Sequence, residues 1–254
     1  DGKLYHIRYT LEDDPKSFIT VATTRPETML GDTGVAVHPE DDRYSKVIGK
    51  NATLPIMDRP IPVVADEAID REFGTGALKV TPAHDPIDFE IGGRHGLEVF
   101  NVIGLDGNLT SAAGKYEGTE RNEARQKVVE ELDQIGLLGT VEDHRHSVGH
   151  CQRCGTVVEP LVSLQWFVNL GGQHQPDSIA GKAHAAVANG DIKVVPERFA
   201  RVYLNWLENI RDWGISRQLW WGNRIPIWSA AVEAADFSDR VRQLGELLQE
   251  DDIC

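Results

Sequence analysis

The sequence is poor in cysteine and has no long apolar run. Its 254 residues include only three cysteines, too few for the disulfide framework of a small secreted domain. No stretch approaches the roughly 20 apolar residues that a membrane-spanning helix needs, and the first ten residues lack the basic and then apolar pattern of a signal peptide. With 41% hydrophobic and 26% charged residues, we expect a globular cytoplasmic protein with no membrane partner.

Positive charge is also in short supply. Lysine and arginine number 26 against 40 aspartates and glutamates, which gives a formal net charge of −14. This balance argues against a protein that coats nucleic acid without specificity, because phosphate contact requires positive potential. Residues 193–224 differ, since arginines and aromatic residues are mixed there. That stretch could contact RNA, or it could be a solvated basic face over an aromatic core.

Two of the cysteines form a Cys-x-x-Cys pair, Cys151 and Cys154, in HCQRCG. A structural zinc site needs four ligands, so the pair supplies at most half of one. A redox pair would need a strand before it and a helix after it, which the flanking sequence does not indicate. The missing ligands could come from outside this chain or from the nearby histidines His144, His146 and His150.

Alternating apolar and polar residues predict strands over much of the first 110 residues. In KLYHIRYTL (3–11), the period of two places Tyr5, Ile7, Tyr9 and Leu11 on one face. Further strands are predicted in SFITVAT, GVAVHP, VVADEAI and ALKVTP. Three prolines interrupt TLPIMDRPIPVV (53–64), and this pattern predicts an extended edge rather than a helix.

Two segments have the spacing of amphipathic helices, 119–136 and 197–213. The inward face of the first would carry Ala124, Val128, Leu132 and Ile135, with Gly136 as the stop. That of the second would carry Phe199, Val202, Tyr203, Trp206 and Ile210. A weaker helix is expected from Ser238. The composition changes near residue 145, so we predict two parts, 1–145 and 146–254.

Two polar loops in the first part contain most of the candidate site residues. TTRPETMLGDTG contains Thr23, Thr24, Arg25 and Glu27. TPAHDPIDFE contains Thr81, His84, Asp85 and Asp88, and Lys79 precedes it. Each loop follows a predicted strand, so both could line one pocket.

Such a pocket would suit a small zwitterionic ligand. Asp85 and Asp88 could bind an ammonium group, the threonines could hydrogen-bond a polar substrate, and Lys79 or Arg25 could face a phosphate or a developing oxyanion. Two aspartates that flank a proline are also typical of a capped turn with no further function.

Paired carboxylates raise two further alternatives. A glycosidase usually lines its sugar cleft with aromatic residues, whereas the first 145 residues contain no tryptophan. A metal site built on His84, Asp85 and Asp88 is conceivable, but adjacent residues rarely converge on one ion. Neither fits as well as a zwitterion pocket.

Several long motifs carry a family resemblance. TTRPETMLGDTGVAVHPEDDRY and FGTGALKVTPAHDPIDFEIGGRHGL closely resemble the editing domain of valyl-tRNA synthetases, an insertion in the nucleotide-binding fold of class I synthetases. HSVGHCQRCGTVVEPLVSLQWFV and DWGISRQLWWGNRIPIW resemble the stretches that join this insertion back to the core. Isoleucyl enzymes typically carry TTTPWT where this chain has TTRPET. Leucyl enzymes have similar loops, but the continuation GDTGVAVHPEDDRY is valyl-like.

The resemblance implies a fold and an activity. The fold would be α/β, with a β-barrel-like editing domain and flanking helices over 1–145 and a smaller mixed or helical connecting module over 146–254. The activity would be hydrolysis of threonine mischarged on valine tRNA. The alternatives are a non-catalytic tRNA-positioning module and the editing domain of a leucyl or isoleucyl relative.

The resemblance also implies roles for single residues. Asp85 would hold the α-ammonium group of the substrate, while Asp88, Thr81 and Lys79 would help to recognise the threonyl side chain or the terminal adenosine. The catalytic set would be Asp85, Asp88 and Lys79. The substrate-binding set would be Thr23, Thr24, Arg25, Glu27, Thr81 and His84.

Partners and cofactors follow from the same resemblance. The partners would be the acceptor end of valine tRNA, the threonine moiety and the rest of a synthetase. Editing would need no cofactor. Cys151 and Cys154 would be half of a zinc site completed by cysteines outside this chain. No HIGH-like or KMSKS-like signature is present, so we expect that this chain does not activate an amino acid by itself.

Overall fold

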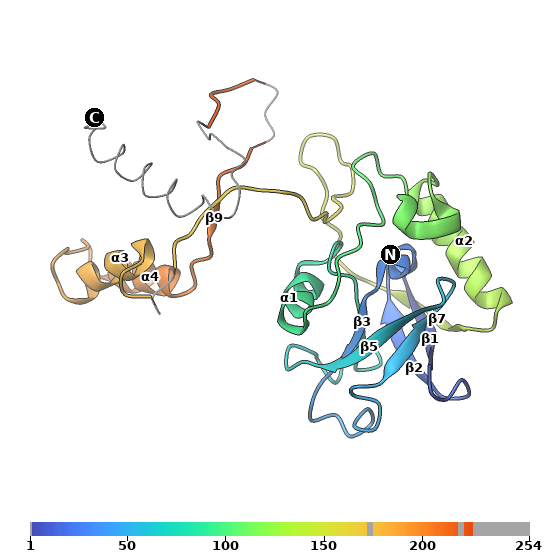
Figure 1. Cartoon of the computed structure of the whole chain (residues 1–254). Coiled ribbons are helices and arrows are strands. Elements are labelled where there is room, and N and C mark those ends of the chain that lie inside the picture. Colours follow the sequence, from blue (N-terminus) through green and yellow to red (C-terminus); the bar gives the residue numbers. More distant parts are fainter. Residues whose placement is uncertain (1, 172–174, 218–220, 226–254) are drawn as a thin grey trace, which may run out of the picture. The chain divides into compact units, whose positions relative to one another are not determined.

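The computed structural model divides the chain into two compact units, Asp1–Leu164 and Gln165–Cys254 (Figure 1). It describes residues 2–171, 175–217 and 221–225. The helix expected from Ser238 lies outside these residues. The compact units divide later than residue 145, because the intervening segment packs on the first unit: Leu161 contacts its core, and the Val162 amide donates to the Ala83 carbonyl at 3.2 Å. The functional division at 145 stays a prediction.

The first unit is built on one strongly curved sheet. Its strand order is β2-β1-β4-β5-β3-β6. Strand β7 pairs with the first half of β1, along the edge opposite β2. The two ends of this order, β2 and β6, lie against each other, so the sheet forms a nearly closed barrel. The strands are β1 (Gly2–Leu11), β2 (Phe18–Thr23), β3 (Gly34–Val37), β4 (Asn51–Leu54), β5 (Arg59–Ala65), β6 (Ala77–Val80) and β7 (Leu138–His144). The predicted β-barrel-like domain is confirmed.

Strand β1 follows the predicted alternation over most of its length. Ile7, Tyr9 and Leu11 are buried, and β1 pairs antiparallel with β2 from Tyr5 opposite Thr23 to Thr10 opposite Phe18. A bulge shifts the pairing with β7 between Tyr5 and Ile7. Because the alternation changes phase there, Leu4 rather than Tyr5 is buried at the start of the strand.

The proline-rich segment 53–64 was predicted to be an extended edge. It is extended, but it does not form an edge strand of the sheet. It forms a hairpin of β4 and β5, and β5 lies inside the sheet between β4 and β3. Pro60 and Pro62 are tolerated because they occupy the half of β5 that pairs with β4 alone. Pairing with β3 begins only at Val63.

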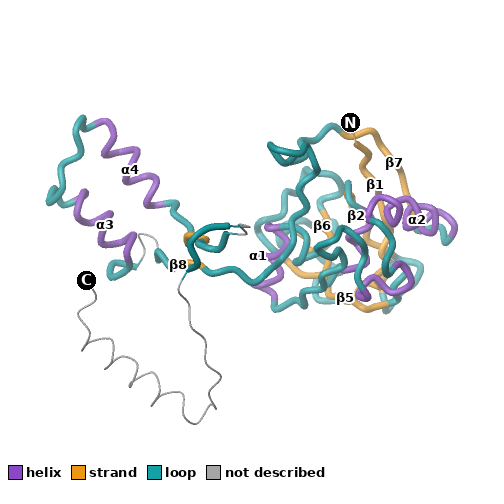
Figure 2. Tube along the Cα trace, turned by 90° about the horizontal axis from the view of Figure 1, so that it is seen from above, coloured by secondary structure: helices purple, strands orange, loops and turns teal. Residues whose placement is uncertain are grey.

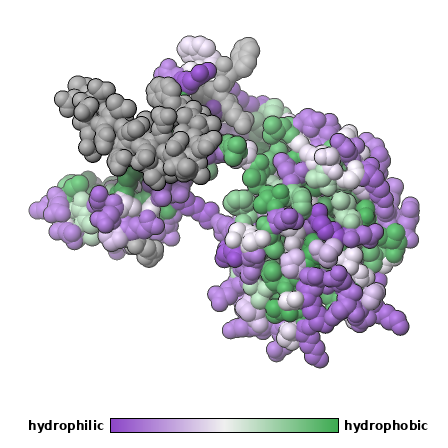
Figure 3. Space-filling view, in the orientation of Figure 1, coloured by the Kyte–Doolittle hydropathy of each residue, from purple (hydrophilic) through white to green (hydrophobic). Residues whose placement is uncertain are grey.

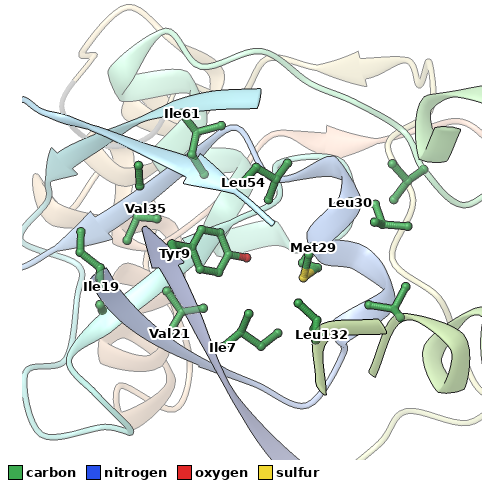
Figure 4. Packing of buried hydrophobic residues seen from close by; sticks show 14 of the residues in the cluster. Ile7, Tyr9, Ile19, Val21, Met29, Leu30, Val35, Leu54, Ile61 and Leu132 are labelled. Atoms are coloured by element: carbon green, nitrogen blue, oxygen red, sulfur yellow. The ribbon is translucent and has the colours of Figure 1, made fainter. Parts of the chain in front are cut away.

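Helices and one face of the barrel enclose the main core. Helix α2 (Arg121–Gln134) packs against β7 and against the 3-10 helix η1 (Pro26–Gly31). The predicted inward residues Ala124, Val128 and Leu132 are buried, whereas Ile135 is exposed because the helix ends at Gln134. Figure 4 shows Tyr9, Met29, Leu54 and Leu132 converging from different elements. A second 3-10 helix, η2 (Ser111–Tyr116), packs against η1.

Sequence patterns did not predict helix α1 (Pro86–His95), which directly follows the second polar loop. Its hydrophobic face is slight, since Asp88, Ile91 and Gly92 are its only buried residues. Asp66 clamps its far end: the carboxylate accepts hydrogen bonds from Arg94 at 2.9 Å, and His95 Nε2 also lies 2.9 Å away. Asp66 thus fixes the C-terminal end of α1 and helps to hold the helix in place.

The second unit is small and mixed, as predicted. Helices α3 (Ile179–Ala188) and α4 (Arg198–Glu208) lie side by side (Figure 2), and β8 (Phe167–Val168) pairs with β9 (Trp213–Gly214). Of the face predicted for α4, Tyr203 and Ile210 pack against a cluster of Leu170, Ala180 and Leu207. Phe199, Val202 and Trp206 are exposed instead.

Polar and apolar residues are interspersed on the visible face of the first unit (Figure 3). Among the described residues, no helix combines the length and the apolar character needed to cross a bilayer.

Candidate functional site

A pocket of about 270 Å³ opens where β2 and β6 end. We call it the β2–β6 pocket. Its polar lining consists of Thr23, Thr24, Arg25, Thr28, Lys79, Thr81, His84, Asp85 and Asp88, and its apolar lining of Leu4, Ala22, Phe73, Leu78 and Ile87. The two polar loops therefore meet in one place. Every candidate residue of the first unit's polar loops except Glu27 lines this pocket, as does Lys79.

Glu27 lies behind the pocket wall. Its side chain is fully buried and accepts two hydrogen bonds from Arg125, at 2.8 Å from Nε and 2.7 Å from Nη2. This bidentate pair ties η1 to α2. The family resemblance implies a substrate-binding role for Glu27, but in the structure the 3-10 helix η1 directs its side chain inward.

Under the pocket lies a buried charge cluster centred on Asp32. Its Oδ2 accepts from Tyr9 Oη at 2.6 Å, and its Oδ1 accepts from Thr81 Oγ1 and lies 3.3 Å from Lys79 Nζ. Burial raises the pKa of Asp32, and Lys79 with these hydroxyl donors opposes the increase. Burial, and then Asp32, raise the pKa of Tyr9 well above its usual value. Asp32 is not among the site residues predicted from the sequence, although it lies in the first polar loop.

The ammonium group of Lys79 makes its hydrogen bonds within this cluster. Its ammonium group contacts Thr28 Oγ1 at 3.0 Å, Asp32 Oδ1 and Thr81 Oγ1. An ammonium group has three protons, so these acceptors account for all of them. Lys79 supplies positive charge to the pocket floor, but it would have to give up a partner to donate to a ligand.

Asp88 is buried beside the same cluster. Its Oδ2 accepts from the Thr81 amide at 2.8 Å, which connects α1 to the end of β6. Burial raises the pKa of Asp88 to about 7, while Lys79 and the Thr81 amide oppose the increase. Asp88 can therefore change its charge near neutral pH.

Asp85 is exposed at the pocket mouth and caps helix α1. Its Oδ1 accepts from the amides of Ile87 at 2.8 Å and Asp88 at 3.3 Å, and Pro86 occupies the first helical position. The capped turn that the sequence left open as an alternative is therefore present. Among the described residues, Oδ2 has no hydrogen-bond donor, so one oxygen of the carboxylate is available to a ligand.

His84 is buried and neutral. Its Nε2 accepts from the amides of Val102 at 2.9 Å and Ile103 at 3.4 Å, which places the proton on Nδ1. Burial is the main cause, and the positive charge of Arg25 the second, that lowers the pKa of His84 to about 4. The nearby Pro160 carbonyl opposes this decrease, although it lies outside hydrogen-bonding geometry for Nδ1. The imidazole ring thus links the second polar loop to residues 102 and 103. The backbone carbonyl of His84 accepts a hydrogen bond from Arg25 Nη1 at 2.9 Å.

A second pocket, of about 460 Å³, adjoins the first. We call it the arginine pocket. It shares Thr24, Arg25 and Asp85 with the β2–β6 pocket, and residues 146–149 and 157–160 line its other side. Sequence reasoning missed this pocket. Its further charged lining residues are Lys3, Arg121, Arg125 and Glu159.

The Cys-x-x-Cys pair lies in a tight turn of the first unit. The Gly155 amide donates to the Cys151 carbonyl at 2.9 Å, and Gly155 has a positive φ of 71°. This turn holds both cysteines on one loop, which fits two ligands of a zinc site. Among the described residues, no group of three or more potential metal ligands occurs, so that part of the chain offers the pair alone.

Comparisons with known proteins identify the family. Residues 22–251 match the family of tRNA synthetases class I (I, L, M and V). The chain therefore belongs to the class I tRNA synthetases.

Within that class, it is similar to a segment of valine–tRNA ligases. The enzyme of Carboxydothermus hydrogenoformans is 59% identical over 228 residues, which are 90% of this chain and 25% of the relative. The enzyme of Geobacter sulfurreducens is 51% identical over 260 residues, which are 97% of this chain and 29% of the relative. The chain thus spans about a quarter of the length of these relatives.

Two solved structures are similar to part of the chain. The ternary complex of LeuRS, tRNA and LeuAMS from Agrobacterium radiobacter K84 has a TM-score of 0.45 and 20% identity and covers 62% of this chain and 24% of that one. The crystal structure of GlLeuRS-CP1 has a TM-score of 0.45 and 15% identity and covers 56% of this chain and all of that one.

Proposed function

We propose that the β2–β6 pocket hydrolyses threonine mischarged on valine tRNA, as the proofreading site of a valine–tRNA ligase. The observation that carries the proposal is the convergence of Asp85, Asp88, Arg25 and four threonines on one small pocket. A synthetic site built for valine discriminates against threonine only about a hundredfold, so a second, hydrolytic site is needed. That site must favour a hydroxyl group, and a polar lining does so.

Different residues of the pocket bind different parts of the substrate. The free oxygen of Asp85 receives the α-ammonium group of the amino acid at the mouth of the pocket. Asp88, Thr81 and Lys79 recognise the threonyl hydroxyl or the terminal adenosine from the floor. Phe73, exposed on the rim, offers a ring on which a base can stack.

Hydrolysis replaces the ester bond to the ribose with a bond to water. Water adds to the carbonyl carbon, the C–O bond to the ribose breaks, and a proton from the water ends on the ribose oxygen. Arg25 is the better cation for the intermediate oxyanion, because guanidinium has five N–H donors and Arg25 uses only some of them. A neighbouring ribose hydroxyl of the tRNA can position the water, so the reaction needs no cofactor.

Other partners follow from the same proposal. The acceptor end of valine tRNA brings the ester to the pocket, and the remainder of the ligase carries out synthesis. Cys151 and Cys154 supply two thiolates to a structural zinc ion, with cysteines outside this chain as the other ligands. This ion has no part in the hydrolysis.

Asp85→Asn provides the sharpest test. Asparagine caps a helix about as well as aspartate, so α1 keeps its start while the negative charge disappears. We expect kcat/KM for threonyl-tRNA to fall at least about tenfold, equivalent to about 1.4 kcal/mol, with valyl-tRNA hydrolysed slowly by both proteins. Asp106→Asn is the matched control, since Asp106 forms a similar local turn by accepting from the Asn108 amide at 3.0 Å.

Two outcomes would contradict the proposal. Equal hydrolysis by the wild type and Asp85→Asn would remove the ammonium role of Asp85. No hydrolysis by the wild type, with tRNA binding confirmed and the remainder of the ligase present, would favour a non-catalytic positioning module.

A further inference from the structure

Glu159 connects the segment after the Cys-x-x-Cys turn to both pockets. Its carboxylate pairs with Arg25 Nη2 through one oxygen and with Arg121 Nη1 through the other, the latter at 2.7 Å. The Glu159 side chain is only 13% exposed. In sequence, Glu159 lies 134 positions after Arg25, and no local pattern links the two.

Arg25 needs such a partner because little else fixes its guanidinium. The Glu27 carboxylate lies 3.8 Å from Arg25 Nε, beyond hydrogen-bonding distance, and already binds Arg125 through both oxygens. Within the described part of the chain, the remaining contact of the Arg25 guanidinium is with the His84 carbonyl. Glu159 is therefore its principal charged partner among the described residues.

The backbone of Glu159 is itself held in place. Pro160 lies beside the His84 ring, Leu161 packs against the main core, and Val162 bonds to Ala83 in the second polar loop. Glu159 thus reaches Arg25 from a segment that is docked on the loop carrying His84 and Asp85. A carboxylate on a fixed backbone orients a guanidinium more closely than one on a free loop.

We propose that Glu159 is a positioning residue of the editing site, which holds the Arg25 guanidinium at the junction of the two pockets. Without the charge of Glu159, Arg25 would be free to turn toward Asp85, which lines the same two pockets. That turn would withdraw the cation from the ester whose hydrolysis it assists. The inference has a structural half, that Glu159 holds the Arg25 guanidinium, and a catalytic half, that this position of Arg25 promotes ester hydrolysis. Only the catalytic half rests on the proposed function.

The structural half is tested by chemical modification of Arg25 in the full chain. Phenylglyoxal reacts with accessible guanidinium groups, and mass spectrometry gives the rate at each arginine. We expect Glu159→Gln to increase the rate at Arg25 several-fold. Glu131→Gln is the matched control: Glu131 also pairs with a cation, Lys115, its side chain is 23% exposed, and it lines neither pocket. Its substitution should leave the rate at Arg25 unchanged.

The catalytic half is tested by the kinetics of threonyl-tRNA hydrolysis. Glu159→Gln should lower kcat about tenfold with little change in KM, because Arg25 acts on the transition state. In an Arg25→Lys background, the same substitution should lower kcat less than about twofold, since the guanidinium that Glu159 orients is gone. A purely structural effect would give the same factor in both backgrounds.

The outcomes separate the two proposals. An unchanged modification rate at Arg25, or equal kcat factors in the two backgrounds, would overturn the positioning role. Faster modification of Arg25 in a protein whose wild type hydrolyses no ester would support the positioning role and refute the proposed function.

Discussion

Lys79 shows what a single residue contributes at the pocket floor. Its side chain is 8% exposed, and Asp32, its partner, is fully buried. Removing the cation leaves a buried carboxylate without its charged partner, which typically costs about 3–5 kcal/mol. We expect Lys79→Met to lower the free energy of unfolding of the first unit by about this amount, and we expect Asp32→Asn to restore part of it in the double variant.

Urea unfolding followed by circular dichroism would measure this loss. All six tryptophans lie after residue 165, so their fluorescence reports the second unit and should be unaffected. Lys50→Met is the control, because Lys50 forms an exposed pair with Asp13 at 2.8 Å, and such pairs contribute less than about 1 kcal/mol. Equal effects of the two substitutions would contradict the structural role of Lys79.

Asp88 gives the stability of the first unit a dependence on pH. Its pKa is raised from 3.8 to about 7 in the folded protein. Between these values the folded state holds a proton that the unfolded state has lost, so the contribution of Asp88 to stability decreases as the pH rises from about 4 to 7. The slope is at most about 1.4 kcal/mol per pH unit.

Asp88→Asn removes this titration and keeps an oxygen to accept from the Thr81 amide. We expect a flatter dependence of the unfolding free energy on pH between 4 and 7, and a variant more stable than the wild type at pH 8. The other groups facing Asp88, namely Lys79, Asp85 and Asp32, remain in both proteins. An unchanged slope in urea titrations at several pH values would refute the shifted pKa.

At the scale of elements, the sequence predicted what local patterns encode. Strand β1 and helix α2 were predictable because each has one buried face with a regular period. Helix α1 was missed because it buries little, although Asp85 followed by Pro86 is a typical helix start. Strand β7 was missed because most of its side chains are exposed.

The candidate site divides in the same way. The meeting of the two polar loops was predictable, since each follows a strand and strand ends gather at one edge of a sheet. The inward turn of Glu27 and the contact between Glu159 and Arg25 were not, because both depend on tertiary packing between residues about a hundred positions apart or more. Single-sequence patterns carry no information on such pairs.

At the scale of the whole molecule, the net charge of −14 bears on the proposed encounter with tRNA. A protein that makes six to ten phosphate contacts loses about a thousandfold or more in affinity between 50 and 200 mM salt. The cationic residues near the site are few, and Glu27 and Glu159 bind three of them, Arg25, Arg121 and Arg125. The described surface around the site therefore offers little free positive charge with which to hold the tRNA backbone.

We accordingly expect KM for threonyl-tRNA to rise less than about tenfold over that salt range. A 3′-threonyl adenosine, which lacks the tRNA backbone, should show a KM that does not change with salt, because under the proposed function the pocket binds the amino acid and the terminal nucleoside. Steady-state hydrolysis of both substrates at four salt concentrations would test this. A thousandfold increase in KM for threonyl-tRNA would mean that the chain itself grips the backbone, in which case the arginine pocket is the first place to look for phosphate contacts.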